Sequence, residues 1–489
     1  MKNNTFLLPG FHLPTLRRRP RSTAEKLALI KEKIKHHSIS QIGDCFGQLI
    51  PSTMLENYSD GSFSRRRIFS KSNTFWAFFS QILDSDGGCK EVVRKVQAYM
   101  ANNHKQVPSA STSAYCQARA KLNESCLASV LTNTASHLTK QAIHNKLNNR
   151  RVIVVDGTGL SMPDTQQNQE CWPQPASQKA GCGFPQLRVC ACFCLQTGAL
   201  INYEYGDHKT SELPMLRKQH KYFKKGDIFL GDKGFCSYFD LAQFKQIGVD
   251  SVISLARRKP MSTSSAIKVL DEDDLLISWP RPRRHHKASY SKEQWQQLPE
   301  ELTLRQIKVK VQQPGFRCKS FYIITTLLDP HMYPKHEVAE LYLQRWDVEL
   351  FFRDIKTTMG MDILKCVSPT MIKKEILMYF IVYNCIRFLM IQSSEKHNKP
   401  IRKISFKSTI QTLRQWEPHI NQCRHDSRKM VNAMHKILDS IAVDILYQRL
   451  GRREPRCLKR RPKTYDRMNR PRAEMMEIPH RSRYRANKP

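Results

Sequence analysis

Short apolar runs rich in β-branched residues begin at residue 151, and they constrain the fold more than any other feature. RVIVVDGTGL at 151–160 predicts a buried strand that runs into a loop. GDIFLGDKGFCSYFDLAQFKQIG at 226–248 predicts a strand, a loop and a helix, and DSVISLARR at 250–258 predicts a further strand. Between the segments at 151–160 and 226–248, LRVCACFCLQTGALINYEYG indicates two strands joined by a Thr-Gly turn. Strands that give way to helices in this manner predict a mixed α/β layer.

The regions on either side of these strands have a different character. The 489 residues exceed one ordinary domain, and a domain size of about 150 residues suggests about three units. The N-terminal part has apolar residues at helical spacing, with basic residues interleaved, including arginine runs at 17–21 and 65–67. We therefore expect a mainly helical DNA-binding region (1–150), a first part of the α/β core (151–256), a β-rich insertion (257–333), a second part of the core (334–395), a helical C-terminal region (396–450) and a basic, flexible tail (451–489).

The charge balance indicates the kind of partner. Lys and Arg number 80 against 43 Asp and Glu, which gives a formal net charge of +37. An enzyme that acts on small molecules does not need such a large positive charge. A polyanionic partner such as nucleic acid explains the charge, because binding of each phosphate releases counterions. For a single Lys or Arg the simpler interpretation, a solvated helical face, remains open.

A membrane partner is not expected. The longest apolar run, Ile376 to Ile391, is interrupted by Asn384 and Arg387 and is shorter than the roughly 20 residues of a span. It is predicted to be a buried core helix. The N-terminus shows no apolar segment followed by a small-residue cleavage site, so a cytoplasmic location is expected. Cys190, Cys192 and Cys194 share one strand face, and without a CxxC or His pair they favour small buried hydrophobes over a zinc site.

Two aspartates stand where predicted strands give way to glycine-containing loops. Asp156 follows VIVV and Asp232 follows DIFLG. Cleavage and transfer of phosphodiesters need divalent metals, and magnesium prefers a few hard carboxylate ligands. Each aspartate taken alone is also compatible with a turn former or a helix cap.

A third acidic residue lies in a more specific pattern. In ELYLQRWDVELFFRDIK, the offsets between Tyr342, Arg345, Glu349 and Lys356 place these four residues along one helix face. A carboxylate beside two cations suits a site that holds metal and phosphates together. Asp347 and Asp354 fall off this face. An exposed helix with ion pairs remains the alternative from spacing alone.

The Tyr-x2-Arg-x3-Glu-x6-Lys pattern resembles the signature of DDE transposases of bacterial insertion sequences, in the insertion-sequence-four family. The segments VVDGTGLSMPDTQQNQECWPQPASQKAGCGFPQLRV, LQTGALINYEYGDHKTSELPMLRK, KGDIFLGDKGFCSYFDL and CLKRRPKTYDRMNRPRAE also resemble this family, and the likeness runs from about residue 110 to 475. The resemblance implies an RNase H-like catalytic core with a β-rich insertion. It also implies a bacterial, nucleoid-associated enzyme.

The resemblance further implies the roles of single residues. Asp156, Asp232 and Glu349 match the metal-binding catalytic triad, which would hold Mg²⁺, with Mn²⁺ as an alternative. Tyr342, Arg345 and Lys356 match residues that hold DNA phosphates, and Trp346 is either a DNA contact or a core aromatic. Some relatives pass through a DNA hairpin and stack a flipped base on an aromatic side chain of the insertion. The candidates for such a residue here are Phe321, Tyr322 and Trp279.

The function expected on this basis is cut-and-paste transposition. The enzyme would bind the terminal inverted repeats of double-stranded transposon DNA, cleave them and join the 3′ ends to target DNA. At least two copies, and so a homodimer, would bring the two ends together. Two alternatives remain open: a metal-dependent endonuclease of the same fold that does not join ends, and an inactive DNA-binding repressor remnant.

Overall fold

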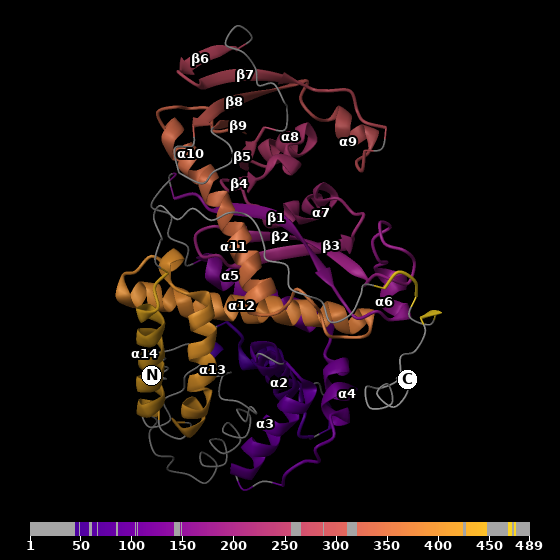
Figure 1. The fold of residues 1–489 in the computed structure, drawn as a ribbon. Coiled ribbons are helices and arrows are strands. Elements are labelled where there is room, and N and C mark those ends of the chain that lie inside the picture. Colours follow the sequence, from indigo (N-terminus) through magenta and orange to yellow (C-terminus); the bar gives the residue numbers. More distant parts are fainter. Residues whose placement is uncertain are drawn as a thin grey trace, which may run out of the picture.

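A mixed α/β fold built on a large sheet is seen in the computed structural model of the chain (Figure 1). Its strands are β1 (Val152–Ser161), β2 (Gln186–Cys194), β3 (Leu200–Asp207), β4 (Ile228–Gly231), β5 (Asp250–Ser254), β6 (Lys268–Asp271), β7 (Asp274–Pro280), β8 (Glu301–Lys310) and β9 (Ser320–Thr325). The structure describes residues 45–446, apart from 48, 58–60, 66, 85–86, 103, 105, 141–146, 148, 256–265, 287, 311–319 and 424–426, together with 468–471, 474 and 475.

The order of the strands in the sheet is β3-β2-β1-β4-β5-β9-β8-β7-β6. The first three form an antiparallel meander, and β4 and β5 then run parallel to β1. The expected Thr-Gly turn between β2 and β3 is confirmed, with Gly198 at a positive φ of 67°. The sequence-based expectation of an α/β layer is therefore correct.

The central strands are buried on both faces, because their side chains alternate between two hydrophobic cores. Val152 and Val154 of β1 lie in the larger core, whereas Ile153 and Val155 lie in the smaller one. The smaller core is covered by α7 (Glu212–Gln219) and α8 (Tyr238–Gln246). Cys190, Cys192 and Cys194 are fully buried in it as small hydrophobic side chains, as expected.

The outer strands β6–β9 continue the same sheet, because β9 pairs antiparallel with β5. The helix α9 (Lys292–Gln296) lies between β7 and β8 in the sequence. The run LTLRQIKVK at 302–310 alternates as a half-exposed strand would, but most of β8 is buried, and Arg305 is completely enclosed. Its guanidinium is neutralised by a bidentate pair with Asp274 of the neighbouring strand, which a one-dimensional pattern cannot reveal.

Helices make up most of the described N-terminal residues. They are η3 (Ser52–Leu55), α2 (Lys71–Leu83), α3 (Cys89–Asn102), α4 (Ser113–Lys121) and α5 (Glu124–Lys140). Helix α5 packs against β3 and α12, so the helical part and the sheet share one core. The arginine run at 17–21 lies outside the described residues.

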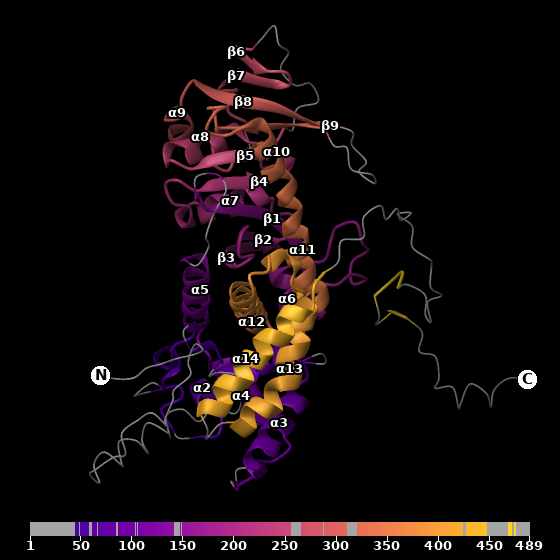
Figure 2. The ribbon, with the colours of Figure 1, turned by 90° about the vertical axis from the view of Figure 1, so that its left-hand side faces the viewer.

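The apolar run at 376–391 lies within α12 (Pro369–His397), which crosses the middle of the molecule between the sheet and the helices α2, α3, α4, α13 (Phe406–Gln422) and α14 (Ser427–Val443) (Figure 1). By length and composition this helix is long and apolar enough to cross a membrane, but 94% of its most apolar window is buried inside the fold. The prediction of a core helix is confirmed. The helices α13 and α14 pack against it (Figure 2), and most of the basic tail lies outside the described residues.

The sequence after Pro334 has helical spacing that continues to about residue 395, but the structure interrupts this pattern before α12. The segment before α12 consists of α10 (Lys335–Leu343), the 3-10 turn η7 (Gln344–Trp346), α11 (Asp347–Arg353) and the π-helical turn η8 (Asp354–Thr358). Residues 359–368 are not helical, since Gly360 takes a positive φ of 83°. This break returns the chain to β1, where Leu364 N donates to Ser161 O at 2.9 Å.

Asn384 is the buried polar side chain that ties α12 to the sheet. Its amide oxygen accepts a hydrogen bond from Leu200 N at 2.9 Å, and its nitrogen donates to Leu200 O at 3.0 Å. We predict that Asn384→Leu lowers the free energy of unfolding by about 2 kcal/mol or more, because each buried group left unsatisfied costs about 1–3 kcal/mol. Urea denaturation measures this loss. Gln392→Leu on the same helix is the matched control and should change stability far less; equal losses would contradict the assignment.

Candidate functional site

Asp156 and Asp232 lie near each other, just beyond the point where the parallel pairing of β1 with β4 ends. The last residues that pair between β1 and β4 are Val154 and Leu230. Asp156 comes two residues after Val154, and Asp232 comes two residues after Leu230. The prediction that Asp232 follows a strand is confirmed: it caps η5 (Lys233–Phe235), where its Oδ1 accepts from Gly234 N at 2.7 Å. Parallel order thus brings together residues that are far apart in sequence.

The position of Asp156 corrects one expectation. The sequence predicts a loop after Val155, whereas β1 continues to Ser161 and Asp156 pairs with Ala191 of β2. The extension is antiparallel pairing with β2, which overrides the weak strand preference of Asp and Gly. Asp156 lies beyond the residues of β1 that pair with β4, although it still pairs with β2.

Burial dominates the electrostatics of Asp156. It raises the pKa of this carboxyl to about 6, and the nearby charges of Asp232 and Glu212 add to the rise. The Gly157 N–H, which donates to Asp156 Oδ1 at 2.8 Å, and the Arg345 guanidinium act in the opposite direction. A divalent cation beside this carboxyl would offset the cost of burying its charged form, because the cation stabilises the ionised carboxylate.

The helical segment 335–358 brings Arg345 close to Asp156. Arg345 is only 7% exposed, and its charge acts on Asp156 on one side, while Glu349 Oε1 lies 3.8 Å from its Nη2 on the other. The Nε atom is buried and makes no hydrogen bond within the described part of the chain. Tyr342 is 6% exposed and is hydrogen-bonded to Arg345 and Ser254. The spacing pattern therefore places Tyr342, Arg345 and Glu349 together in space.

The other two residues of the segment lie differently. Lys356 lies in the π-helical turn, and its ammonium pairs with Asp362 at 3.0 Å instead of with Glu349. Trp346 is 44% exposed, and the Arg345 guanidinium lies 4.6 Å from its ring centroid. The single helix face inferred from spacing assumes a regular α-helix, and the 3-10 and π turns break that regularity.

The three candidate ligands do not form one cluster in this structure. Within the described residues, no three His, Cys, Asp or Glu side chains gather closely enough to hold a metal ion. Asp156 and Asp232 lie near each other. The side chain of Glu349, in contrast, is 55% exposed and forms an ion pair with Arg345. The chemistry of the donor set nevertheless fits Mg²⁺ or Mn²⁺, since all the oxygens are carboxylates.

Glu212, the first residue of α7, is a fourth carboxylate that the sequence analysis missed. Its side chain occupies the space above Gly157: a Cβ built on that glycine would lie 2.0 Å from Glu212 Oε1. Burial raises its pKa first, Asp232 raises it further, and Arg188 lowers it. The available signal was the glycine after Asp156, because glycine inside a strand often marks a close approach of another group.

The three aromatic residues proposed for base stacking lie at different places. Phe321 of β9 contacts Tyr342, with ring centroids 5.2 Å apart. Trp279 of β7 contacts Tyr238 of α8, with centroids 5.8 Å apart. Tyr322 follows Phe321 on β9 and therefore points to the opposite face of the sheet. Of the three, Phe321 touches a residue of the candidate site.

Comparison with known proteins supports one class of protein. Residues 147–385 match the family described as "Transposase DDE domain", and this match includes Asp156, Asp232 and Glu349. Together with the curated relative below, it supports a DDE transposase, an enzyme that cleaves or transfers polynucleotide strands.

Individual proteins resemble the chain over most of its length. The transposase InsG for insertion sequence element IS4 of Escherichia coli (strain K12) is 23% identical over 359 residues, which are 73% of this chain and 78% of the relative. Among solved structures, the piggyBac transposase synaptic complex with hairpin DNA matches 82% of this chain and 81% of its own, with 12% identity and a TM-score of 0.39.

The close approach of Glu212 to Gly157 leads to a first prediction about the site. Gly157→Ala should lower stability and displace the Glu212 side chain, because the added methyl group overlaps it. In the double variant with Glu212→Ala that loss should be largely relieved. Urea denaturation of both single variants and the double variant gives the coupling free energy, which is expected at about 0.5–3 kcal/mol for residues in contact. Additive effects would show that the two residues do not share this space.

The raised pKa of Asp156 predicts how stability depends on pH. The folded-state pKa of about 6 lies above the ordinary value of 3.8, so folding favours the protonated acid. The contribution of the protonated Asp156 carboxyl to the stability of the fold is complete below pH 3.8 and is lost as the pH rises through about 6. In metal-free protein, the stability of wild type relative to Asp156→Asn should therefore decrease between about pH 4 and about pH 7, which denaturant titrations measure. Asp164→Asn, at an exposed position after β1, controls for net charge. A constant difference would refute the assignment.

Proposed function

We propose that this chain is a DNA transposase that binds the ends of an insertion sequence, cleaves them and joins the 3′ ends to target DNA. The observation that carries the proposal is that Asp156 and Asp232 lie near each other beyond the parallel pairing of β1 with β4, with the buried Arg345 close to Asp156. Two carboxylates with an adjacent buried guanidinium suit a metal ion and a phosphodiester. The likeness to the DDE domain over 147–385 agrees with this assignment.

We propose an RNase H-like core for the catalytic part. The antiparallel meander β1–β3, continued by the parallel strands β4 and β5, supports this assignment. The core would comprise 151–256 and 334–395, interrupted by the β-rich insertion at 257–333. The region 1–150 would bind DNA, 396–450 would support α12, and the tail at 451–489 would add a basic arm.

The candidate ligands are Asp156, Asp232 and Glu349. Mg²⁺ or Mn²⁺, when bound, would activate the attacking oxygen and stabilise the leaving oxygen. Glu349 has to leave Arg345 and turn toward the aspartates to complete the set, and its side chain is exposed enough to do so. DNA would favour the exchange, because a phosphate can replace the Glu349 carboxylate on the Arg345 guanidinium.

The same argument gives roles to the neighbouring residues. Arg345 and Lys356 would hold phosphates of the transposon end, with Lys356 exchanging Asp362 for DNA. Tyr342 would orient Arg345 through their hydrogen bond. Trp346, which is half exposed beside Arg345, would pack on the DNA strand. If the reaction passes through a hairpin, Phe321 is the aromatic residue best placed for stacking, because it contacts Tyr342.

The proposed reaction has two phosphoryl-transfer steps. In the first, water attacks the phosphorus at the transposon end; the bond to the 3′ oxygen breaks, leaving a 3′-hydroxyl and a 5′-phosphate. In the second, that 3′-hydroxyl attacks a phosphorus of target DNA and displaces the target's own 3′ oxygen. The number of phosphodiester bonds is conserved in the second step, so no external energy source is required. A dimer would hold the two ends, and the bacterial nucleoid in the cytoplasm would be the place of action.

A cleavage and joining assay tests the proposal. Duplexes that carry the DNA flanking the gene are incubated with the protein, Mg²⁺ and a supercoiled target, and the products are resolved on a gel. Nicked or cleaved ends followed by joined product are expected. Cleaved ends without joining would indicate an endonuclease of the same fold, and binding without cleavage would indicate a repressor.

Replacement of Glu349 separates chemistry from binding. Glu349→Gln should reduce end cleavage by more than about a hundredfold, because even changes outside the metal ligands cost 10–100-fold. Binding of the same duplex, measured by fluorescence anisotropy, should change little. Glu340→Gln on α10, an exposed glutamate of the same helical segment, is the matched control and should retain activity. Cleavage that survives in Glu349→Gln would overturn the triad.

A further inference from the structure

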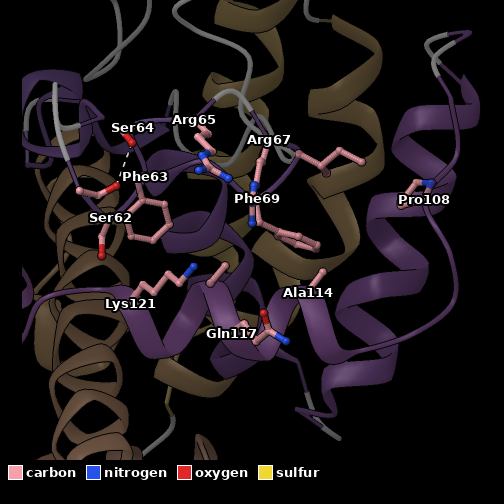
Figure 3. Close-up of a pocket in the computed structure, with 13 residues that line it drawn as sticks. Ser62, Phe63, Ser64, Arg65, Arg67, Phe69, Pro108, Ala114, Gln117 and Lys121 are labelled. Carbon is pink, nitrogen blue, oxygen red and sulfur yellow. Dashed lines mark hydrogen bonds between the residues drawn. The ribbon is translucent and has the colours of Figure 1, made fainter.

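A cavity of about 830 Å³ lies in the N-terminal helical part, remote in sequence from the candidate catalytic residues (Figure 3). It is formed by the loop between η3 and α2, the residue Pro108 before α4, and one side of α4 itself. The lining residues are Gly61, Ser62, Phe63, Ser64, Arg65, Arg67, Ile68, Phe69, Pro108, Ala114, Gln117, Ala118 and Lys121.

The cavity carries three positive charges and no acidic side chain among the described residues that line it. Arg65, Arg67 and Lys121 are all exposed, and none of them makes an ion pair within the described part of the chain. In the close-up these side chains and the Phe63 ring border the same space (Figure 3). Unneutralised cations that converge on one space favour an anionic ligand.

The loop that carries the two arginines is held in place by specific contacts. Phe63 takes a positive φ of 67°, which is a strained conformation for a bulky residue, and its side chain packs against the main hydrophobic core. Ser64 closes the turn, with both its N–H and its hydroxyl donating to Gly61 O. Phe69 packs on Tyr115 of α4 at 5.5 Å between centroids. The cavity is therefore a preformed feature of the fold.

The floor of the cavity is connected to the catalytic part of the chain. Lys121 ends α4, and the carbonyl of the preceding residue, Ala120, accepts a hydrogen bond from Lys374 Nζ of α12 at 2.7 Å. On the same helix, Tyr115 and Arg119 both donate to Gln81 of α2. A ligand held by Lys121 is thus fixed relative to α12, the helix that follows the candidate site.

We propose that this cavity binds phosphodiester groups of double-stranded DNA, with Arg65, Arg67 and Lys121 as the contacts. The inference rests on the proposed function and names the residues of the N-terminal region, apart from the candidate catalytic site, that would contact the DNA backbone. DNA is favoured over a free phosphate ion, because the cations come from two separate elements and line a cavity far larger than one phosphate. The excess positive charge of the whole chain points to the same polyanion.

The test uses the full-length protein and a variant with Arg65→Ala, Arg67→Ala and Lys121→Ala combined. Fluorescence anisotropy gives the affinity for two duplexes, one from the DNA flanking the gene and one of unrelated sequence, at several salt concentrations. Removal of one cation from a phosphate should reduce the slope of log K against log salt by about 0.9, so the triple variant should show a slope smaller by about 2–3. The reduction should be the same for both duplexes, because phosphate contacts carry no sequence information.

The matched control removes the same charge elsewhere. Lys218, Lys224 and Lys245 are exposed lysines around α7 and α8, and their combined replacement by Ala should leave most of the slope intact. Conservative Lys replacements of Arg65 and Arg67 should restore it. Competition by millimolar inorganic phosphate that matches competition by DNA would show that the cavity takes free anions instead.

Several outcomes would overturn the inference. Equal reductions of the slope in the cavity variant and the control variant would show that only net charge matters, and an unchanged slope would show that DNA does not reach the cavity. In both cases normal end cleavage by the wild type would leave the proposed function standing. If the wild-type protein neither binds nor cleaves either duplex, the proposed function itself fails.

Discussion

The burial of α12 is the constraint on which the rest of the structure depends. A helix this apolar is stable inside a protein only if its polar side chains find partners, and Asn384 and Arg387 do so on the β2–β3 hairpin. Arg387 donates to Thr197 O, and its guanidinium also lies 5.4 Å from the Phe351 ring centroid of α11. One side chain therefore joins the meander, the central helix and the helix that carries Glu349.

The core strands follow from the sequence pattern, whereas the grouping of Asp156 with Asp232 is expected only from the family resemblance. Both aspartates lie after apolar runs, and parallel strands bring such positions to one edge. The extension of β1 through Gly157 could not be foreseen, because it depends on the partner strand β2 and not on local preference. The buried ion pair between Arg305 and Asp274 is not predicted either, because it depends on which two strands are neighbours in the sheet.

The helical signature was predictable as a pattern but not as a geometry. Spacing places Tyr342, Arg345 and Glu349 together, yet it does not show that the first two are buried while Glu349 faces solvent. The π turn around Lys356 has no signal in hydrophobic periodicity. Glu212 was missed because its neighbourhood with Asp156 arises only when α7 packs across β1.

The outer strands share one sheet with the strands that carry or precede Asp156 and Asp232, and this has a mechanical consequence. The pairing of β9 with β5 makes the layer from β4 to β8 behave as a single twisted plate. Moving β7 or β8 relative to β4, the strand that precedes Asp232, would therefore require the backbone hydrogen bonds of the intervening strands to bend or break.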